Sequence, residues 1–453
     1  MRRLDLGLLC DWIVLHEKDG PVTARGYFLG IENQKIAVLE KLQKSDLQEA
    51  QRDLQARFDC REWRVLSNRA VVPGLINAHT HTAMTLLRGV ADDLAFETWI
   101  FKKILPLERA LVSAQFVRTG AELAAMEFIR FGVTAVADMY FFAPEMARVW
   151  DRVGLRGVVG SCFTDFPAPG NLSGDRKEWE RQWDELWEGF GKHPLVRPSL
   201  APHAPYSCSE ETLAATVRLR EKYGVPLQIH VSETAGEVQE SRQKHEMTPV
   251  ARLQRLGCVG RGVMYAHCVH VDDGDIEILA KTKTSVIHNP ESNLKLGAGI
   301  APVPELLRAG VNVGIGSDGS ASNNNLSLFH EMDTAAKLQK IRIADQTSFG
   351  AREVLQMATL GGATAIGLEQ EIGSLSVGKS ADLFVIDLGY PHLQPIYDLI
   401  SHIVYSMTGL EVETVWCAGK KLFDKGSYIS IDKEAVFSSV ASFQKKVLAQ
   451  TVS

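Results

Sequence analysis

Four segments of the sequence end in side chains that can bind a metal ion, and each follows an apolar run typical of a buried strand. They are Ala-His79-Thr-His81, Gln-Ile-His230-Val-Ser-Glu233, Ala-His267-Cys-Val-His270 and Gly-Ser-Asp318-Gly. In a barrel of parallel strands the carboxyl ends meet at one face, where these side chains could share an ion. Histidines and a carboxylate suit a borderline ion such as zinc, with one position left for water. Water bound in this way ionises near neutral pH, so the pattern indicates a hydrolase.

The predicted ligands of one divalent ion, most simply Zn²⁺, are His79, His81, His230 and Asp318. Residues two apart on a strand point to the same side, so His79 and His81 could bind one ion together. Alone, this pair could be two unrelated polar residues at a strand end. Its combination with His230 and Asp318 on other strand ends favours a metal site.

Three residues are candidates for the proton transfers of a hydrolase. Glu233 lies three residues after His230, and it is either a solvated loop carboxylate or a proton carrier beside the metal. We favour the proton carrier. His267 ends a strand with no other polar side chain at its end, so it could contact the water on the metal. Asp318 could both hold the metal and take the proton of that water.

The elements that would position these residues form a parallel α/β pattern between residue 70 and about residue 365. Eight candidate strands end near residues 79–81, 140, 163, 203, 230, 267, 288 and 318, which predicts a (β/α)8 barrel over residues 71–365. Strand-like runs in residues 1–70 and 366–453 predict a β-sandwich domain built from both chain ends, with a C-terminal helix. Residues 42–58 predict an inserted helix that packs locally.

A run of tryptophans marks one predicted helix of the barrel. Trp179, Trp183 and Trp187 recur every four residues, which places them on one face of a helix. We interpret this stripe as packing of the helix onto the barrel rather than as a binding platform.

Composition limits the partners of the chain. A net charge of -6 offers no basic surface for nucleic acid. The seven cysteines form no Cys-x-x-Cys pair, and their odd number indicates reduced thiols in the cytosol. No apolar run is long enough to span a bilayer. We expect a cytoplasmic homo-oligomer that acts on a small molecule, not on nucleic acid or a membrane.

The sequence resembles the amidohydrolase superfamily, and within it the 5'-methylthioadenosine/S-adenosylhomocysteine deaminases and their triazine-hydrolase relatives. The most specific stretches are Pro-Gly-Leu-Ile-Asn-Ala-His-Thr-His, Ala-Pro-His-Ala-Pro-Tyr-Ser-Cys-Ser, His-Asn-Pro-Glu-Ser-Asn-Leu-Lys-Leu-Gly and Ser-Asp-Gly-Ser-Ala-Ser-Asn-Asn-Asn. The resemblance implies the same barrel with a small β-sandwich. It also implies one metal rather than two, because the fourth strand end lacks the lysine that bridges two metals in other members.

The resemblance further implies roles for residues of the site. Glu233 would protonate the purine ring and pass the proton to the departing ammonia, and His267 would help to activate the hydroxide. Glu108 would hold the ribose hydroxyls and His203 would face a ring nitrogen. Trp99 and Ser322 would line the pocket.

The expected reaction is hydrolytic deamination of an adenosine analogue to the inosine analogue and ammonia, with 5'-methylthioadenosine as the first substrate and S-adenosylhomocysteine or adenosine as further ones. The alternatives are an aminohydrolase or halohydrolase of another amino-heterocycle, such as a triazine, guanine or a pterin, and a metal-free barrel without catalytic activity. Glu108 favours a nucleoside, because a sugar-free ring has no ribose hydroxyls to bind.

Some relatives that accept S-adenosylhomocysteine carry an arginine late in the third barrel strand. Ser161 stands at that place here and brings no charge. Arg176 is either a second arginine for the amino-acid tail of this substrate or a solvated loop charge. We therefore expect 5'-methylthioadenosine to be preferred over S-adenosylhomocysteine.

Overall fold

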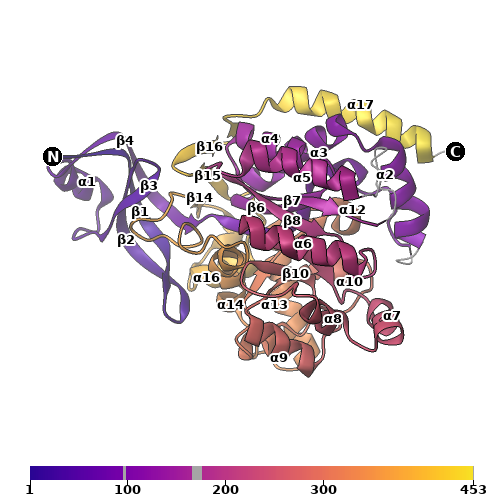
Figure 1. Cartoon of the computed structure of the whole chain (residues 1–453). Helices are drawn as coiled ribbons and strands as arrows, with labels where there is room; N and C mark the ends of the chain where they lie inside the picture. The colour runs from indigo at the N-terminus through magenta and orange to yellow at the C-terminus, as the bar shows by residue number, and fades with distance from the viewer. Residues whose placement is uncertain (95–97, 166–175, 452–453) are drawn as a thin grey trace.

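The structure is a computed structural model, and it describes residues 1–94, 98–165 and 176–451. Two sheets organise the chain, a parallel barrel and a mixed sheet of eight strands beside it (Figure 1). The first residue lies at the outer tip of the mixed sheet, and the last helix runs along the top of the barrel in this view (Figure 1).

The barrel consists of strands that pair in chain order, each parallel to the next. They are β5 (Leu75–His81), β6 (Val133–Tyr140), β7 (Arg156–Phe163), β8 (Val196–Pro202), β9 (Leu227–Val231), β10 (Val263–His267), β11 (Ser285–His288) and β12 (Val313–Ile315). The short β13 (Asp318–Gly319) follows β12 and pairs with β5, which closes the barrel. The predicted (β/α)8 barrel is confirmed.

Helices alternate with the strands and form the outer layer of the barrel. After β5 come η1 (Thr82–Leu87), η2 (Thr98–Ile104), α2 (Leu105–Leu111) and α3 (Ala114–Arg130). The next are α4 (Ala143–Val153), α5 (Arg176–Phe190), α6 (Glu210–Tyr223), α7 (Ala235–His245), α8 (Pro249–Arg255), α9 (Asp273–Thr282), α10 (Pro290–Lys295) and α11 (Val303–Arg308). The barrel region ends with α12 (Ser320–Asn323), α13 (Leu328–Ile343), α14 (Ala351–Gln356), η3 (Met357–Gly361) and α15 (Gly362–Ala365).

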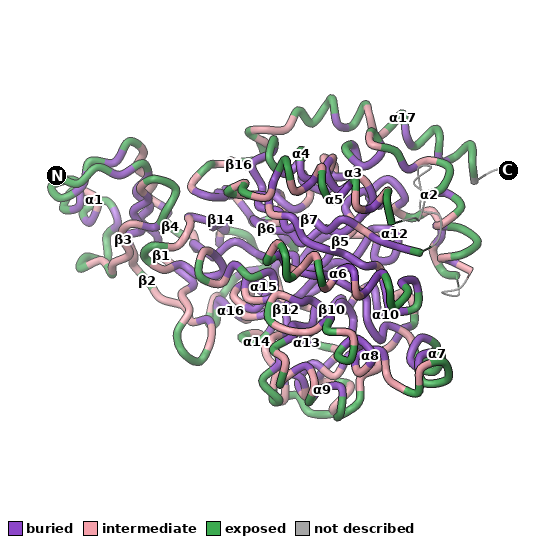
Figure 2. Tube along the Cα trace, viewed as in Figure 1, coloured by how far each residue is buried: buried purple, intermediate pink, exposed green. Residues whose placement is uncertain are grey.

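The barrel interior is apolar at the amino ends of its strands. Side chains such as Ile76, Ala135 and Met264 pack there with Ala363 and Ala365 of α15, which covers this end. Buried residues run through the barrel strands in Figure 2. Because this end is filled, the chemically active side chains gather at the carboxyl ends of the strands.

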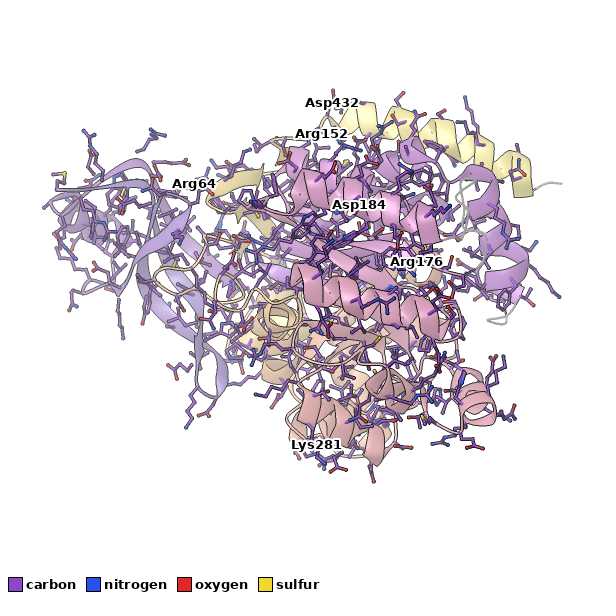
Figure 3. All side chains as sticks on the ribbon, viewed as in Figure 1. Arg64, Arg152, Arg176, Asp184, Lys281 and Asp432 are labelled. Carbon is purple, nitrogen blue, oxygen red and sulfur yellow. The ribbon has the colours of Figure 1, made fainter. Side chains whose placement is uncertain are left out.

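Both ends of the chain build the mixed sheet, as predicted. The amino-terminal strands are β1 (Arg2–Glu17), β2 (Gly20–Glu32), β3 (Lys35–Lys41) and β4 (Phe58–Pro73), and the carboxyl-terminal ones are β14 (Leu383–Asp387), β15 (Val412–Cys417), β16 (Lys420–Asp424) and β17 (Ser427–Tyr428). Strand β4 joins the two sets, because it pairs with β1 on one side and β14 on the other. Arg64 adds an ion pair to Asp424 at 2.6 Å across the same junction (Figure 3).

The inserted helix predicted within residues 42–58 is α1 (Leu47–Gln55), and Asp46 caps its first turn. Leu47, Ala50 and Leu54 pack on Leu4 and Phe58 of the neighbouring strands. This helix therefore packs locally, as expected.

The C-terminal helix α17 (Lys433–Thr451) does not lie on the mixed sheet with which the sequence groups it. It runs along α2 and α3 of the barrel (Figure 1), and the rings of Phe443 and Phe116 lie 5.4 Å apart. Val436, Phe443 and Val447 form its buried side. Further carboxyl-terminal helices are η4 (Pro391–Leu393) and α16 (Leu399–Tyr405). Over the described ranges, no helix combines the length and apolarity needed to cross a bilayer.

The tryptophan stripe of α5 packs as predicted for two of its three members. Trp179 and Trp183 are buried, and Trp179 lies 4.3 Å from the ring of Phe163 at the end of β7. Trp187 is only partly buried, and it contacts Tyr223 at the end of α6.

Candidate metal centre and active site

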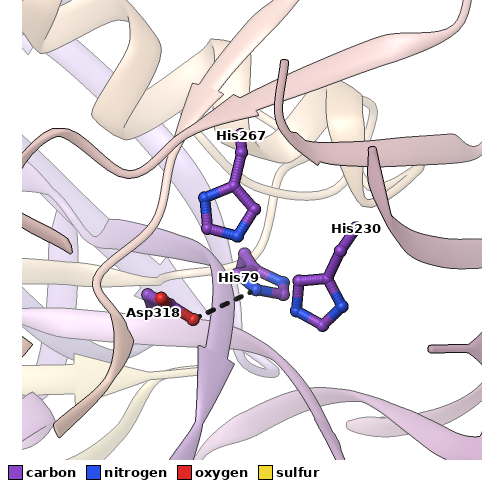
Figure 4. A group of neighbouring side chains, drawn as sticks. All are labelled: His79, His230, His267 and Asp318. Atoms are coloured by element: carbon purple, nitrogen blue, oxygen red, sulfur yellow. Dashed lines mark ion pairs between the residues drawn. The ribbon is translucent and has the colours of Figure 1, made fainter. Parts of the chain in front are cut away.

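The carboxyl ends of strands β5, β9 and β10 and the start of β13 bring five predicted site residues together. Nitrogen or oxygen atoms of His79, His230, His267 and Asp318 all lie within 4.8 Å of one another (Figure 4). His81 joins them, because its Nε2 lies 3.2 Å from Asp318 Oδ1 and 3.1 Å from His230 Nε2. The ends of the barrel strands thus form one compact group of donors.

Hydrogen bonds to backbone carbonyls fix the orientation of two of these imidazoles. His81 Nδ1 lies 2.7 Å from the carbonyl of Met139, and His230 Nδ1 lies 2.7 Å from the carbonyl of His203. A carbonyl only accepts, so each Nδ1 carries a proton, and in the neutral ring that binds a metal each Nε2 presents a lone pair. Two lone pairs that face each other at 3.1 Å repel, unless a cation lies between them. Histidines that bind a metal through one ring nitrogen typically donate a hydrogen bond from the other nitrogen, as these two do to the backbone carbonyls.

His79 and Asp318 complete the same arrangement. His79 Nε2 is buried without a hydrogen-bond partner among the described residues, and Asp318 Oδ1 lies 3.5 Å away. Burial lowers the pKa of His79 to about 4, so its ring is neutral. Hydroxyls of Ser292 and Ser322 donate to Asp318 Oδ2 at 2.6 and 2.8 Å, which leaves Oδ1 toward the histidines. Neutral imidazoles and one carboxylate fit a single zinc-type ion.

Glu233 faces His267, which is itself a member of this group. His267 Nδ1 lies 2.8 Å from Asn293 Oδ1, and His267 Nε2 lies 3.9 Å from Glu233 Oε2. With its Nδ1 proton donated to Asn293, His267 presents the Nε2 lone pair to the site. Burial raises the pKa of Glu233, and His267 opposes this rise. A raised pKa makes this buried carboxyl a better proton donor and acceptor for catalysis than a solvated one.

Glu237 holds the turn that carries Glu233, although the sequence reasoning missed it. Its carboxylate accepts from the backbone N–H of Ser232 at 3.0 Å and of Glu233 at 2.8 Å. Ser232 has a φ of 52°, in the left-handed region. Thr234, three residues before Glu237, caps α7 by accepting from the Glu237 N–H. The spacing Thr-x-x-Glu, typical of a helix start, was the signal that could have found this residue.

Glu108 lies on α2. It is buried, and the hydroxyl of Tyr140 at the end of β6 donates a hydrogen bond to its carboxylate. Burial raises the pKa of Glu108 to about 7, against the effect of this hydrogen bond. Trp99, on η2, is also buried. Tyr140 is a further site residue that was not predicted, although it ends a barrel strand.

His203 follows β8 and lies beside the metal group, with its ring 4.9 Å from that of His230. Its Nδ1 lies 2.9 Å from the hydroxyl of Ser207. Burial lowers the pKa of His203 to about 4, so the ring is neutral. A neutral ring at this place can exchange a hydrogen bond with a bound molecule through Nε2.

Two residues considered for the tail of a substrate lie elsewhere than the sequence suggested. Arg176 begins α5 in the helix layer, with its side chain 47% exposed (Figure 3). It donates to Glu180 at 2.6 Å and lies 3.6 Å from Glu211, and it contacts no predicted site residue within the described ranges. On β7, Val158 faces the barrel interior, so by strand alternation Cys162 faces inward and Ser161 outward. The thiol of Cys162, which is uncharged, therefore lines this wall.

Comparison with known proteins places these features in a family. The sequence profile described as "Amidohydrolase family" matches residues 70–422. A 5-methylthioadenosine/S-adenosylhomocysteine deaminase of Syntrophobacter fumaroxidans is 44% identical over 370 residues, which cover 82% of this chain and 84% of that protein. A 5'-deoxyadenosine deaminase of Methanopyrus kandleri is 42% identical over 385 residues, 84% of this chain and 88% of that protein.

Solved structures agree with this comparison. An adenosine deaminase from Xanthomonas campestris, solved with bound zinc, superposes with a TM-score of 0.94 at 35% identity and covers 99% of both chains. The zinc complex of an atrazine chlorohydrolase from Arthrobacter aurescens superposes with a TM-score of 0.87 at 21% identity, over 97% of this chain and 100% of that one. At that identity the second likeness concerns the fold alone.

Proposed function

Because the chain belongs to the amidohydrolase family, we propose that its site removes the exocyclic amino group of an adenosine analogue. Water replaces this group, and the products are the inosine analogue and ammonia. The observation that carries the proposal is the carboxyl of Glu233, 3.9 Å from His267, which belongs to the donor group of the strand ends. The names of the relatives with more than 40% identity support the same reaction.

In this proposal His79, His81, His230 and Asp318 hold one divalent ion, most simply Zn²⁺. When bound, such an ion supplies Lewis-acid activation of a water molecule. The buried Nε2 of His79 and the facing lone pairs of His81 and His230 support this role. The two serine hydroxyls on Asp318 Oδ2 support binding through its other oxygen.

Glu233, His267 and Asp318 carry out the proton transfers. Glu233 gives a proton to the ring nitrogen next to the carbon that bears the amino group, which makes that carbon more electrophilic. His267 orients the attacking water through its Nε2 lone pair, and Asp318 accepts a proton from this water. A proton then passes through Glu233 to the amino nitrogen, so that neutral ammonia leaves. General acid–base steps of this kind contribute on the order of 100-fold to 10,000-fold in rate.

The remaining site residues bind the nucleoside. Glu108 accepts hydrogen bonds from the ribose hydroxyls, with Tyr140 holding its carboxylate. His203 exchanges a hydrogen bond with a ring nitrogen, and Trp99 and Ser322 complete the pocket. A hydrolase of another amino-heterocycle, such as a triazine, guanine or a pterin, is the alternative. The buried Glu108 argues against a sugar-free ring, because such a ring would add no hydrogen bond to a buried carboxylate that has only Tyr140 as its hydrogen-bond donor among the described residues.

The wall at Cys162 favours an uncharged substituent on the 5' carbon. S-adenosylhomocysteine ends in a carboxylate that needs a cation, best a planar arginine. Arg176, the arginine considered for it, is engaged by Glu180 and Glu211. We therefore propose 5'-methylthioadenosine as the preferred substrate.

The test is a screen for ammonia release by the zinc-loaded enzyme. The substrates are adenosine, 5'-methylthioadenosine, S-adenosylhomocysteine, guanine and a melamine-type ring, and Glu233→Gln serves as the inactive control. The proposal requires the nucleosides to react faster than the sugar-free rings. Faster ammonia release from guanine or the triazine would replace the nucleoside proposal with the alternative.

We also propose a cytoplasmic location, which the seven free cysteines support, and a homo-oligomer, which a mass measurement in solution tests.

A further inference from the structure

A second cavity lies at the end of the barrel opposite the metal group. Its volume is about 860 Å³, within the range of small-molecule sites. Residues 191–194, 223–226 and 261–262 line it, just before the amino ends of β8, β9 and β10. Residues 366, 367 and 369, after α15, complete the wall. The site proposed above uses the carboxyl ends of the strands, so this cavity is separate from it.

Three arginines line this cavity, and two of them are already paired with carboxylates. Arg197 lies 2.6 Å from Glu371, and Arg261 lies 3.4 Å from Glu369. Arg220 makes no ion pair within the described ranges, and its one hydrogen bond there runs from Nη2 to the carbonyl of Arg261 at 2.6 Å. Its Nε is buried and has no acceptor among the described residues. Arg220 thus lines the cavity and keeps hydrogen-bonding capacity that the described residues do not use.

Burial of a guanidinium is unfavourable where its donors lose water and gain no acceptor. Burial lowers the pKa of Arg220, and the nearby charge of Glu221, which also lines the cavity, opposes this shift without an ion pair to Arg220 within the described ranges. An anion in the cavity would restore these bonds. Carboxylate and phosphate oxygens both match the planar fork of guanidinium donors, and phosphate can bring the larger negative charge.

The same cavity has an aromatic wall. Trp187 and Tyr223 both line it, and their rings lie 4.6 Å apart. Neither residue is fully buried. Trp187 is also the member of the α5 stripe that packing on the barrel leaves partly free. Flat aromatic surfaces bind planar rings by stacking.

We propose that this cavity binds an aromatic phosphate of the size of a nucleoside monophosphate, with the phosphate on Arg220 and the ring against Trp187 and Tyr223. The proposal is independent of the deaminase reaction, because none of these residues belongs to the site at the other end of the barrel. The ligand would therefore act as an effector rather than as a substrate.

Isothermal titration of the zinc-loaded, full-length protein with uridine 5'-monophosphate tests the proposal. A pyrimidine nucleotide is chosen because it offers no purine to the deaminase site. We expect one site per chain and binding that is at least about tenfold weaker in Arg220→Gln, the scale of a lost charge-assisted hydrogen bond. The matched control is Arg218→Gln, which changes an exposed arginine of the same helix outside the cavity and should bind as the wild type does.

Two further variants keep the test decisive if Arg220→Gln does not fold. Arg220→Lys keeps the charge but loses the fork, so it should bind more weakly than the wild type. Trp187→Leu should weaken the nucleotide and leave inorganic phosphate unchanged. The proposal is overturned by absence of binding at millimolar nucleotide, by an equal loss in Arg218→Gln, by equal affinity for inorganic phosphate, or by competition with the nucleoside substrate in steady-state assays.

Discussion

Removal of the Asn293 amide should slow the reaction without removing the metal. Asn293 is buried on α10, and its Oδ1 lies 2.8 Å from His267 Nδ1. This contact keeps the proton on Nδ1 and directs the Nε2 lone pair of His267 to the site. Asn293→Ala frees the ring to carry its proton on either nitrogen, and it leaves a buried N–H without an acceptor.

The magnitude follows from one lost hydrogen bond in a buried position. A buried donor left unsatisfied costs about 1–3 kcal/mol. If this free energy destabilises the orientation and tautomer of His267 that the reaction needs, kcat/KM decreases by about 5-fold to 150-fold. Loss of a residue that orients an active-site histidine through a hydrogen bond gives a similar range, about 10-fold to 100-fold. We expect a decrease of about 10-fold to 100-fold in Asn293→Ala.

Steady-state ammonia release and metal analysis of the purified variants measure this effect. Asn293→Asp is the matched variant, because a carboxylate of the same size still accepts from Nδ1–H but cannot donate. It should keep kcat/KM within about tenfold of the wild type, since the accepting oxygen is retained. If Asn293→Asp loses as much activity as Asn293→Ala, Asn293 donates to His267 and the assigned orientation is wrong. Loss of the metal in either variant would refute the prediction that Asn293 acts through His267 alone.

Four other expected outcomes test the site and the fold. His230→Ala should lose metal and activity together, and full metal occupancy with normal turnover would remove His230 from the ligand set. Glu233→Gln should keep its metal but turn over at least about 100-fold more slowly, and a loss below tenfold would make it a solvated loop carboxylate. The kcat/KM for 5'-methylthioadenosine should exceed that for S-adenosylhomocysteine by at least about tenfold, or about 1.4 kcal/mol, and a reversed order would mean that a cation reaches the tail. Burial lowers the pKa of His16 to about 4 from 6.5, so between pH 6.5 and 4 His16 binds a proton in the unfolded chain but not in the folded chain. The free energy of unfolding should therefore fall between pH 6.5 and 4, and urea titrations at pH 7 and 5 should show a smaller fall in His16→Gln.

Much of the site was predictable because strand periodicity and strand ends are visible in the sequence. His79, His81, His230, His267 and Asp318 each stand where an apolar run stops, and parallel strands place such ends together. The orienting partners were not predictable in the same way. Asn293 lies 26 residues from His267, and Tyr140 lies 32 residues from Glu108, so only the folded chain brings each pair together.

Two other features depended on information that a local pattern does not carry. The inward side of β7 follows from its register in the barrel, which places Cys162 rather than Ser161 on the inner wall. The apolar face of α17 indicates that the helix packs against another apolar surface, but the sequence does not say which surface of the molecule this is. Its position on α2 and α3 is a result of tertiary packing.

The closing strand pair of the barrel has a consequence for how the chain folds. Asp318 pairs with Thr80, and the hydroxyl of Thr80 donates to the Asp318 carbonyl at 2.9 Å across 238 residues of sequence. The histidines of β5 and the aspartate of β13 therefore meet only after these two strands have paired and the ring of strands has closed. We call this strand pair the seam of the barrel. During synthesis the ribosome must release nearly the whole barrel before the donor group can assemble. An ion held by His79 and Asp318 would link β5 to β13 and stabilise their pairing. Removal of the ion should therefore speed hydrogen exchange of the amides in β5 and β13 before that of other strands.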